Sequence, residues 1–171
     1  MKHFITLAAV AALAVISLSS CKKEGPDKKA QFDYATVTAK YSINEDLDKA
    51  ADVTLNIVKF DGSKMNVPVS TTQQVVDVEK YRGNIPADFK FNFSAKQNDN
   101  LTKDSYNCTL TYEFAVKVYD SNGKLRKSKT SSDTISVGDK KSNIDLIIAR
   151  FNRIRTTISI MEDMTIEEKA E

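Results

Sequence analysis

The sequence predicts an all-β protein, a single antiparallel β-sandwich of about seven or eight strands that follows a signal peptide and a short tether. Three observations favour this fold class. Apolar and polar residues alternate with a period of two through most of the chain after Phe32, turn-forming residues separate these runs at regular spacing, and no long segment has the 3.6-residue period of a helix. A closed β-barrel is the alternative architecture for the same pattern.

Composition excludes several other classes of protein. The chain has 171 residues, the length of one domain, with 28% charged and 41% hydrophobic residues and a formal net charge of +2. These values exclude a collagen-like or wholly disordered chain. They also lack the strongly basic balance of a dedicated nucleic-acid-binding domain, so we expect no nucleic-acid partner.

Residues 1–20 have the features of a secretory signal peptide. Lys2 precedes an apolar run from Phe4 to Leu18, and small residues follow that run. The run is shorter than the roughly 20 residues that cross a bilayer as a helix. We therefore expect a signal that is removed and not a permanent membrane span.

The end of this segment resembles the lipobox of bacterial lipoproteins. Leu18, Ser19 and Ser20 precede Cys21, which matches the leucine, two small residues and cysteine that lipoprotein signal peptidase recognises. The resemblance implies that the Cys21 thiol receives a diacylglyceryl group, that cleavage makes Cys21 the first residue, and that its amine is acylated, commonly with palmitate. Two or three acyl chains hold a protein on a membrane almost permanently. A cysteine beside a conventional cleavage site is the alternative interpretation.

The residues after Cys21 bear on the location of the protein. Lys22 is not the aspartate that retains enterobacterial lipoproteins in the inner membrane, so the resemblance implies an outer-membrane protein. Surface-exported lipoproteins of Bacteroidota-type bacteria often carry an acidic cluster here, whereas this chain has a mixed sequence from Lys22 to Asp27. We therefore favour the periplasmic face of the outer membrane over the cell surface.

Residues 21–31 are expected to be the lipidated cysteine and a flexible tether. They include four lysines, Gly25 and Pro26, and Ala30 is the only apolar residue after Cys21. Such a segment is usually solvated and mobile. Contact of its lysines with anionic lipid headgroups is the alternative.

The sandwich itself is expected from residue 32 to residue 161. Alternating runs separated by turn residues predict strands over 37–43, 53–57, 65–69, 74–81 and 89–95. The clearest run extends from Tyr106 to Val118 and ends at Asn122-Gly123, a dipeptide typical of hairpins because both residues tolerate positive φ. A polar return strand is expected from about Leu125 to Val137.

The C-terminal region is harder to assign. Alternation of Ile144, Leu146 and Ile148 resumes in phase at Ile154, so residues 143–161 are expected to form either one bulged strand or two strands. The tail, residues 162–171, carries five acidic residues and one lysine. We expect this tail to be a frayed helix or disordered.

Two stretches resemble immunoglobulin-like domains. The run from Tyr112 to Lys124 is similar to the F strand and F–G turn of fibronectin type III domains, and residues 51–62 resemble an early hairpin of bacterial immunoglobulin-like domains. Tyr106-Asn107-Cys108 resembles the tyrosine corner of these domains, without a second cysteine to pair with and without the usual core tryptophan. The resemblance implies an immunoglobulin-like sandwich and carries no function.

The chain offers few residues for catalysis. The only histidine, His3, leaves with the signal, which excludes Ser-His-Asp and Cys-His catalysis and histidine-ligated zinc from the mature protein. Cys108 is in phase with Leu110 and Phe114, so we expect it to be a buried, unreactive thiol. With Cys21 lipidated, no internal disulfide can form. We expect no catalytic residue, no cofactor and no metal site.

Two carboxylate-based alternatives stay open. A pair of acids could hydrolyse a glycosidic bond, but nothing in the sequence selects a pair among Asp46, Asp48, Asp77, Glu79, Asp88 and Glu113. The segment from Asn44 to Asp48 begins like a calcium-binding loop, but Lys49 and Leu55 stand where that loop needs glycine and a bidentate glutamate. A solvated acidic turn is the expected structure there.

Basic residues gather between Lys124 and Arg155. We expect these lysines and arginines to be solvated at the edge of a sheet, where they prevent pairing with other chains. The alternative hypothesis is a partner-binding surface with Phe151, Arg153 and Arg155 on one face of a strand.

These expectations converge on a function without catalysis. We expect a lipid-anchored binding or accessory module of the cell envelope, with another envelope protein as its partner. The alternative is capture of an extracellular ligand or glycan at the cell surface, with Tyr81 or Tyr119 as stacking platforms. A third and remote alternative is a small carboxylate-based hydrolase. The oligomeric state is not indicated.

Overall fold

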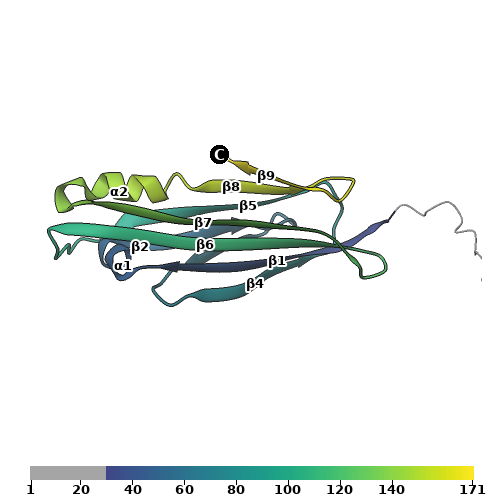
Figure 1. Ribbon diagram of the computed structural model, residues 1–171, viewed down its shortest axis with the longest axis horizontal. Coiled ribbons are helices and arrows are strands. Elements are labelled where there is room, and N and C mark those ends of the chain that lie inside the picture. The colour runs from purple at the N-terminus through teal and green to yellow at the C-terminus, as the bar shows by residue number, and fades with distance from the viewer. Residues whose placement is uncertain (1–29) are drawn as a thin grey trace, which may run out of the picture.

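The protein is an all-β sandwich, as predicted. The computed structural model describes residues 30–171, so the expected signal peptide, lipobox and most of the tether lie outside the described residues. Two antiparallel sheets pack against each other, and two short helices lie at one end (Figure 1). Within the described residues, no helix has the length and hydropathy to span a bilayer.

The first sheet has four strands in the order β4-β1-β6-β7. Long alternating runs form its two central strands, and each buries one face. Its strands are β4 (Gln74–Tyr81), β1 (Phe32–Ile43), β6 (Ser105–Asp120) and β7 (Leu125–Lys140).

The second sheet has five strands in the order β3-β2-β5-β8-β9. Its strands are β3 (Lys64–Pro68), β2 (Ala51–Val58), β5 (Ala87–Gln97), β8 (Arg155–Ile160) and β9 (Ile166–Ala170). β1 and β2 lie in different sheets, whereas the first two strands of a constant-type immunoglobulin domain share one sheet. The architecture is therefore that of the predicted sandwich, with a strand order of its own.

The core lies between the inner faces of the two sheets. Every second residue of β6 from Tyr106 to Val118 is buried, which confirms the predicted alternation. Phe91 of β5 and Phe114 of β6 stack across the two sheets with ring centroids 3.9 Å apart. Aromatic contacts of this kind stabilise a core beyond the area that they bury.

A tyrosine corner ties β6 to the loop before it. The hydroxyl of Tyr106 accepts hydrogen bonds from the backbone N–H groups of Thr102 and Lys103, at 2.9 and 3.1 Å. This is the contact that defines such corners in immunoglobulin-like domains.

The β6–β7 hairpin differs in detail from the predicted turn. Gly123 has a φ of 72°, but Asn122 is not among the residues with positive φ. A single residue in the left-handed region is typical of a bulged hairpin loop and not of the two-residue turn. The carboxylate of Asp120 stabilises this loop by accepting hydrogen bonds from the backbone N–H groups of Asn122 and Lys124.

The prediction of strands over residues 143–161 is wrong for its first half. Ile144–Phe151 is a helix, α2, preceded by one turn of 3₁₀ helix over Lys141–Asn143, and only β8 follows as a strand. Ile144, Ile147, Ile148 and Phe151 are buried, a helical period, whereas Leu146 is exposed. The alternation of Ile144, Leu146 and Ile148 therefore does not reflect a strand. The apolar residues Ile147 and Phe151 fall outside that alternation and fit the helical period instead.

The acidic tail is also not disordered. Residues 166–170 form β9, which pairs with β8 from Ile160–Ile166 to Thr156–Ala170. Met164, with a φ of 65°, makes the turn between the two strands and is itself buried. The sandwich therefore extends almost to the C-terminus and does not end at residue 161.

The expected acidic turn is a short helix, α1 (Glu45–Ala50). The side chain of Asn44 caps it by accepting a hydrogen bond from the N–H of Leu47, and it also accepts one from the N–H of Thr109 in β6. Leu47 and Ala50 are buried against the sandwich. Capping and burial explain why this acidic sequence is helical.

Candidate functional site: an interaction surface

The three residues predicted as a docking patch do not form one surface. Phe151 is fully buried as part of the helical face that packs on the core. Arg153 lies in the turn after α2, and Arg155 begins β8, opposite Asn92 of β5. Phe151 therefore cannot contact a partner, and Arg153 is not on a strand.

The structure instead places Arg153 beside a groove between α2 and β7. The groove encloses about 310 Å³ and is lined by Val137, Asp139, Leu146, Ile147, Ala149, Arg150 and Arg153. Leu146 is 66% exposed, so a large apolar side chain faces solvent at this groove. We call this set of residues the α2 groove.

The α2 groove has an apolar floor and a basic rim. Neither Arg150 nor Arg153 forms an ion pair with another described residue, and both are exposed. The acidic residue of the groove, Asp139, already has hydrogen-bond partners. Its carboxylate accepts hydrogen bonds from the backbone N–H of Lys140 and the side-chain amide of Asn143. The rim therefore has two arginines free to bind carboxylates.

The position of the α2 groove relative to the start of the domain is also informative. α2 lies at one end of the long axis, whereas β1 begins at the other end (Figure 1). A lipid anchor on the preceding chain would leave the α2 groove at the end of the domain away from that attachment.

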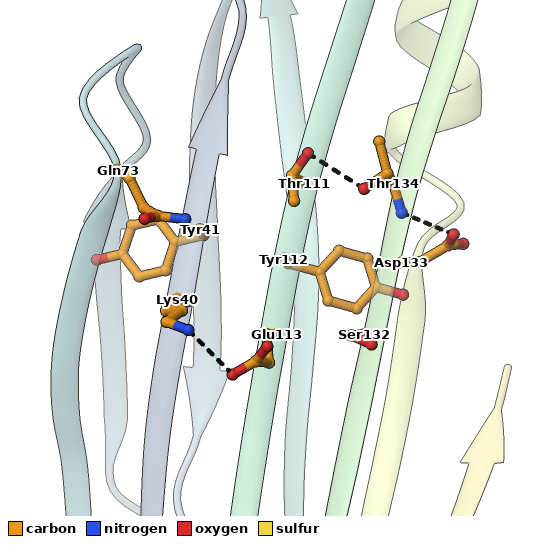
Figure 2. Close-up of a pocket in the computed structure, with 9 residues that line it drawn as sticks. All are labelled: Lys40, Tyr41, Gln73, Thr111, Tyr112, Glu113, Ser132, Asp133 and Thr134. Atoms are coloured by element: carbon orange, nitrogen blue, oxygen red, sulfur yellow. Dashed lines mark hydrogen bonds and ion pairs between the residues drawn. The ribbon is translucent and has the colours of Figure 1, made fainter.

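A second depression lies on the outer face of the four-stranded sheet (Figure 2). Lys40 of β1 and Glu113 of β6 form an ion pair of 3.5 Å at one side of it, and Thr111 and Thr134 share a hydrogen bond of 3.3 Å at another. These groups are already paired with each other. The depression, about 410 Å³, presents no charged group free for a ligand apart from Asp133, whose carboxylate accepts from the N–H of Thr134.

The six acids considered for a hydrolase are distributed over α1, β4, β5 and β6, and four of them are bound to other groups, including Glu113, which is paired with Lys40. Asp46 is paired with Lys103, Glu79 accepts from the N–H of Phe60, and Asp88 accepts from Ser159. Among residues 30–171, no hydrogen bond joins any two of the six acids. The Lys103 hydrogen bond and the N–H of Asn107 hold the pKa of Asp46 below its usual value.

The segment that begins like a calcium-binding loop does not have the geometry of one. Residues 45–48 lie in α1, and Asp46 points to Lys103 and to the N–H of Asn107. Within the described part of the chain, no group of three His, Cys, Asp or Glu side chains is placed to hold a metal ion.

The two tyrosines considered as stacking platforms are in different surroundings. Tyr81 packs against Phe60 and Phe32, and its hydroxyl donates to the carbonyl of Asn84. Tyr119 stacks on Tyr34 of β1 with centroids 4.5 Å apart. Lys80 and Arg82 lie over the ring of Tyr34, so both faces of that ring are occupied.

Cys108 is buried, as predicted. Burial raises the pKa of its thiol to about 11. A thiol with such a pKa is almost fully protonated at neutral pH and is a poor nucleophile.

Sequence reasoning missed Leu146 and Tyr34 as surface residues. A helical reading of residues 144–151 would have placed Leu146 outside the apolar face. Tyr34 meets Tyr119 only through the pairing of β1 with β6, which no local pattern reveals.

Comparison of the chain with protein-family models, with curated proteins and with solved structures gives no match.

Proposed function

We propose that this protein is a lipid-anchored lipoprotein of the outer membrane that binds another envelope protein through the α2 groove and has no catalytic role. The observation that carries the docking part is a groove in which Leu146 stays 66% exposed and to which two arginines without ion pairs, Arg150 and Arg153, contribute. The lipobox sequence that ends at Cys21 supports the anchor.

The chemistry of the groove defines the partner. Its apolar floor suits a leucine-like or aromatic side chain, and Arg150 and Arg153 suit carboxylates next to that side chain. An acidic segment of a protein with a central apolar residue fits both features. A glycan lacks the apolar side chain and is a weaker fit.

The anchor has its own test. We expect the wild-type protein to incorporate radiolabelled palmitate, its N-terminal peptide to carry the mass of an acylated Cys21, and Cys21→Ala to abolish both. An unmodified Cys21 in membrane-extracted protein would contradict the anchor while leaving the α2 groove untouched. Protection from proteinase K in intact cells, and digestion after the outer membrane is permeabilised, are expected for the periplasmic face.

Site-specific photocrosslinking tests the docking surface in cells. A photoreactive residue at position 146 should give one discrete protein adduct, and the adduct should disappear when Arg150→Glu and Arg153→Glu are added. The matched control is position 75, because Val75 of β4 is also 66% exposed but lies on another face. Equal adducts from both positions, or an adduct that survives the charge reversal, would overturn the proposal.

A further inference from the structure

The outer face of the four-stranded sheet carries a cationic and aromatic cluster where β1 begins. Pairing of the strands aligns Lys80, Thr36 and Lys117 in one row across β4, β1 and β6. The stacked pair of Tyr34 and Tyr119 forms the neighbouring row. We call these five residues, together with Arg82, the proximal cluster.

The cations of the proximal cluster are largely free. Lys80 and Lys117 are exposed and form no ion pair with another described residue, although Lys80 lies 4.6 Å from the centre of the Tyr34 ring. Arg82 is partly neutralised because it pairs with Asp33 at 2.9 Å. Two free ammonium groups therefore stand at the two ends of the row, one on each side of Thr36, and both can attract anions.

An anchor at Cys21 would keep this end close to a membrane. Ten residues, 22–31, separate Cys21 from Phe32, and a chain of that length spans at most about 40 Å. Lysines with tyrosines are also the side chains that favour the headgroup region of a bilayer.

Acidic residues lie next to Arg82 at this end of the domain. Glu162, an exposed residue of the turn between β8 and β9, lines a depression together with Asp33 and Arg82. Anionic lipid would attract Lys80 and Lys117 and repel Glu162, so we expect the membrane to meet the lysines on the outer face of the four-stranded sheet.

We propose that the anchored domain leans on the membrane with its four-stranded sheet, and that Lys80 and Lys117 bind the phosphates of anionic phospholipids while Tyr34 and Tyr119 lie at headgroup level. This inference rests on the proposed lipid anchor at Cys21. It gives the domain a fixed tilt in which the outer face of the four-stranded sheet faces the membrane.

Tyrosine fluorescence tests the inference, because the chain has six tyrosines and no tryptophan. The lipid-modified protein is reconstituted in vesicles of brominated phosphatidylcholine, alone or mixed with phosphatidylglycerol. Bromine quenches only fluorophores that are close to the lipid. We expect quenching at least about twofold stronger in the anionic vesicles, because each lysine near an anionic surface adds to the attraction.

Variants separate the cluster from the anchor. Lys80→Glu with Lys117→Glu should abolish the added quenching, whereas Lys90→Glu with Lys96→Glu, the same charge change on exposed residues of the other sheet, should retain it. Equal quenching in both kinds of vesicle, or equal loss in both double variants, would overturn the inference while the anchor stands. Failure of the wild-type protein to associate with either vesicle would remove the anchor and this inference together.

Discussion

Asp120 and Arg126 form an ion pair across the β6–β7 hairpin, with 2.5 Å between Oδ2 of Asp120 and Nε of Arg126. The Asp120 side chain has no solvent exposure, and its other carboxylate oxygen accepts two backbone N–H groups of the turn. One carboxylate therefore holds both the loop and the start of β7.

Replacement of Asp120 should destabilise the fold in a pH-dependent way. Burial raises the pKa of Asp120, but the hydrogen bonds from Lys124, Arg126 and Asn122 outweigh it and hold the pKa below its usual value. Because the folded pKa is the lower one, the stability from this group is present above about pH 4 and is lost as the pH falls through the folded pKa. Asp120→Asn should lower the midpoint of urea unfolding at pH 7 and have progressively less effect in acid.

The control for this prediction is Asp133→Asn, on an exposed residue of β7. The urea midpoints of wild type and Asp120→Asn should therefore converge in acid. If they differ by the same amount from neutral to strongly acidic pH, the charge of Asp120 does not stabilise the hairpin.

Glu79 should show the opposite dependence on pH. Burial raises the pKa of its carboxyl, the N–H of Phe60 opposes this by donating to it, and the charge of Asp61 raises it further. The protonated form is therefore favoured by folding, and this contribution to stability is lost as the pH rises through the folded pKa. Glu79→Gln should be more stable than wild type at pH 7, with a smaller difference in acid. Unfolding midpoints that place Glu79→Gln below wild type at pH 7 would refute this.

Phe151 and Leu146 provide a matched pair within one helix. Phe151 is fully buried and Leu146 is 66% exposed. Phe151→Ala should cost about 3–5 kcal/mol of unfolding free energy. Leu146→Ala should change it by no more than about 0.5 kcal/mol, since exposed positions contribute little. Similar costs for the two variants in denaturant titrations would mean that α2 is packed differently.

Cys108 should be inert in the folded protein. Since its pKa is about 11, iodoacetamide at pH 8 is expected to leave it unmodified within the lifetime of the folded state and to alkylate it rapidly in denaturant. Mass spectrometry of the peptide that contains Cys108 measures both. Fast alkylation without denaturant would contradict the burial of this thiol.

The sequence predicted the sandwich well where strands are long and have one solvent-exposed face. The run from Tyr106 to Val118 forms most of β6, and the polar return strand forms β7, because alternation over many residues is a reliable signal. The tyrosine corner was also visible in the sequence, since a specific contact accompanies that motif.

The functional surface could be predicted only in part. Arg153 belongs to the α2 groove, but Phe151 and Arg155 were assigned to it through a strand that is in fact a helix and a turn. Short apolar runs do not distinguish a helix from a strand. The meeting of β7 with α2 and of Tyr34 with Tyr119 depends on tertiary pairing, which lies beyond any local pattern.

The affinity of the purified protein for the partner crosslinked at position 146 tests the central claim most directly. Arg150→Glu with Arg153→Glu should weaken binding at least tenfold, the equivalent of about 1.4 kcal/mol, and should reduce its dependence on salt. Arg155→Glu with Lys90→Glu, which reverses the same number of charges outside the groove, should bind like wild type. Equal affinity of the two double variants would contradict docking at the α2 groove.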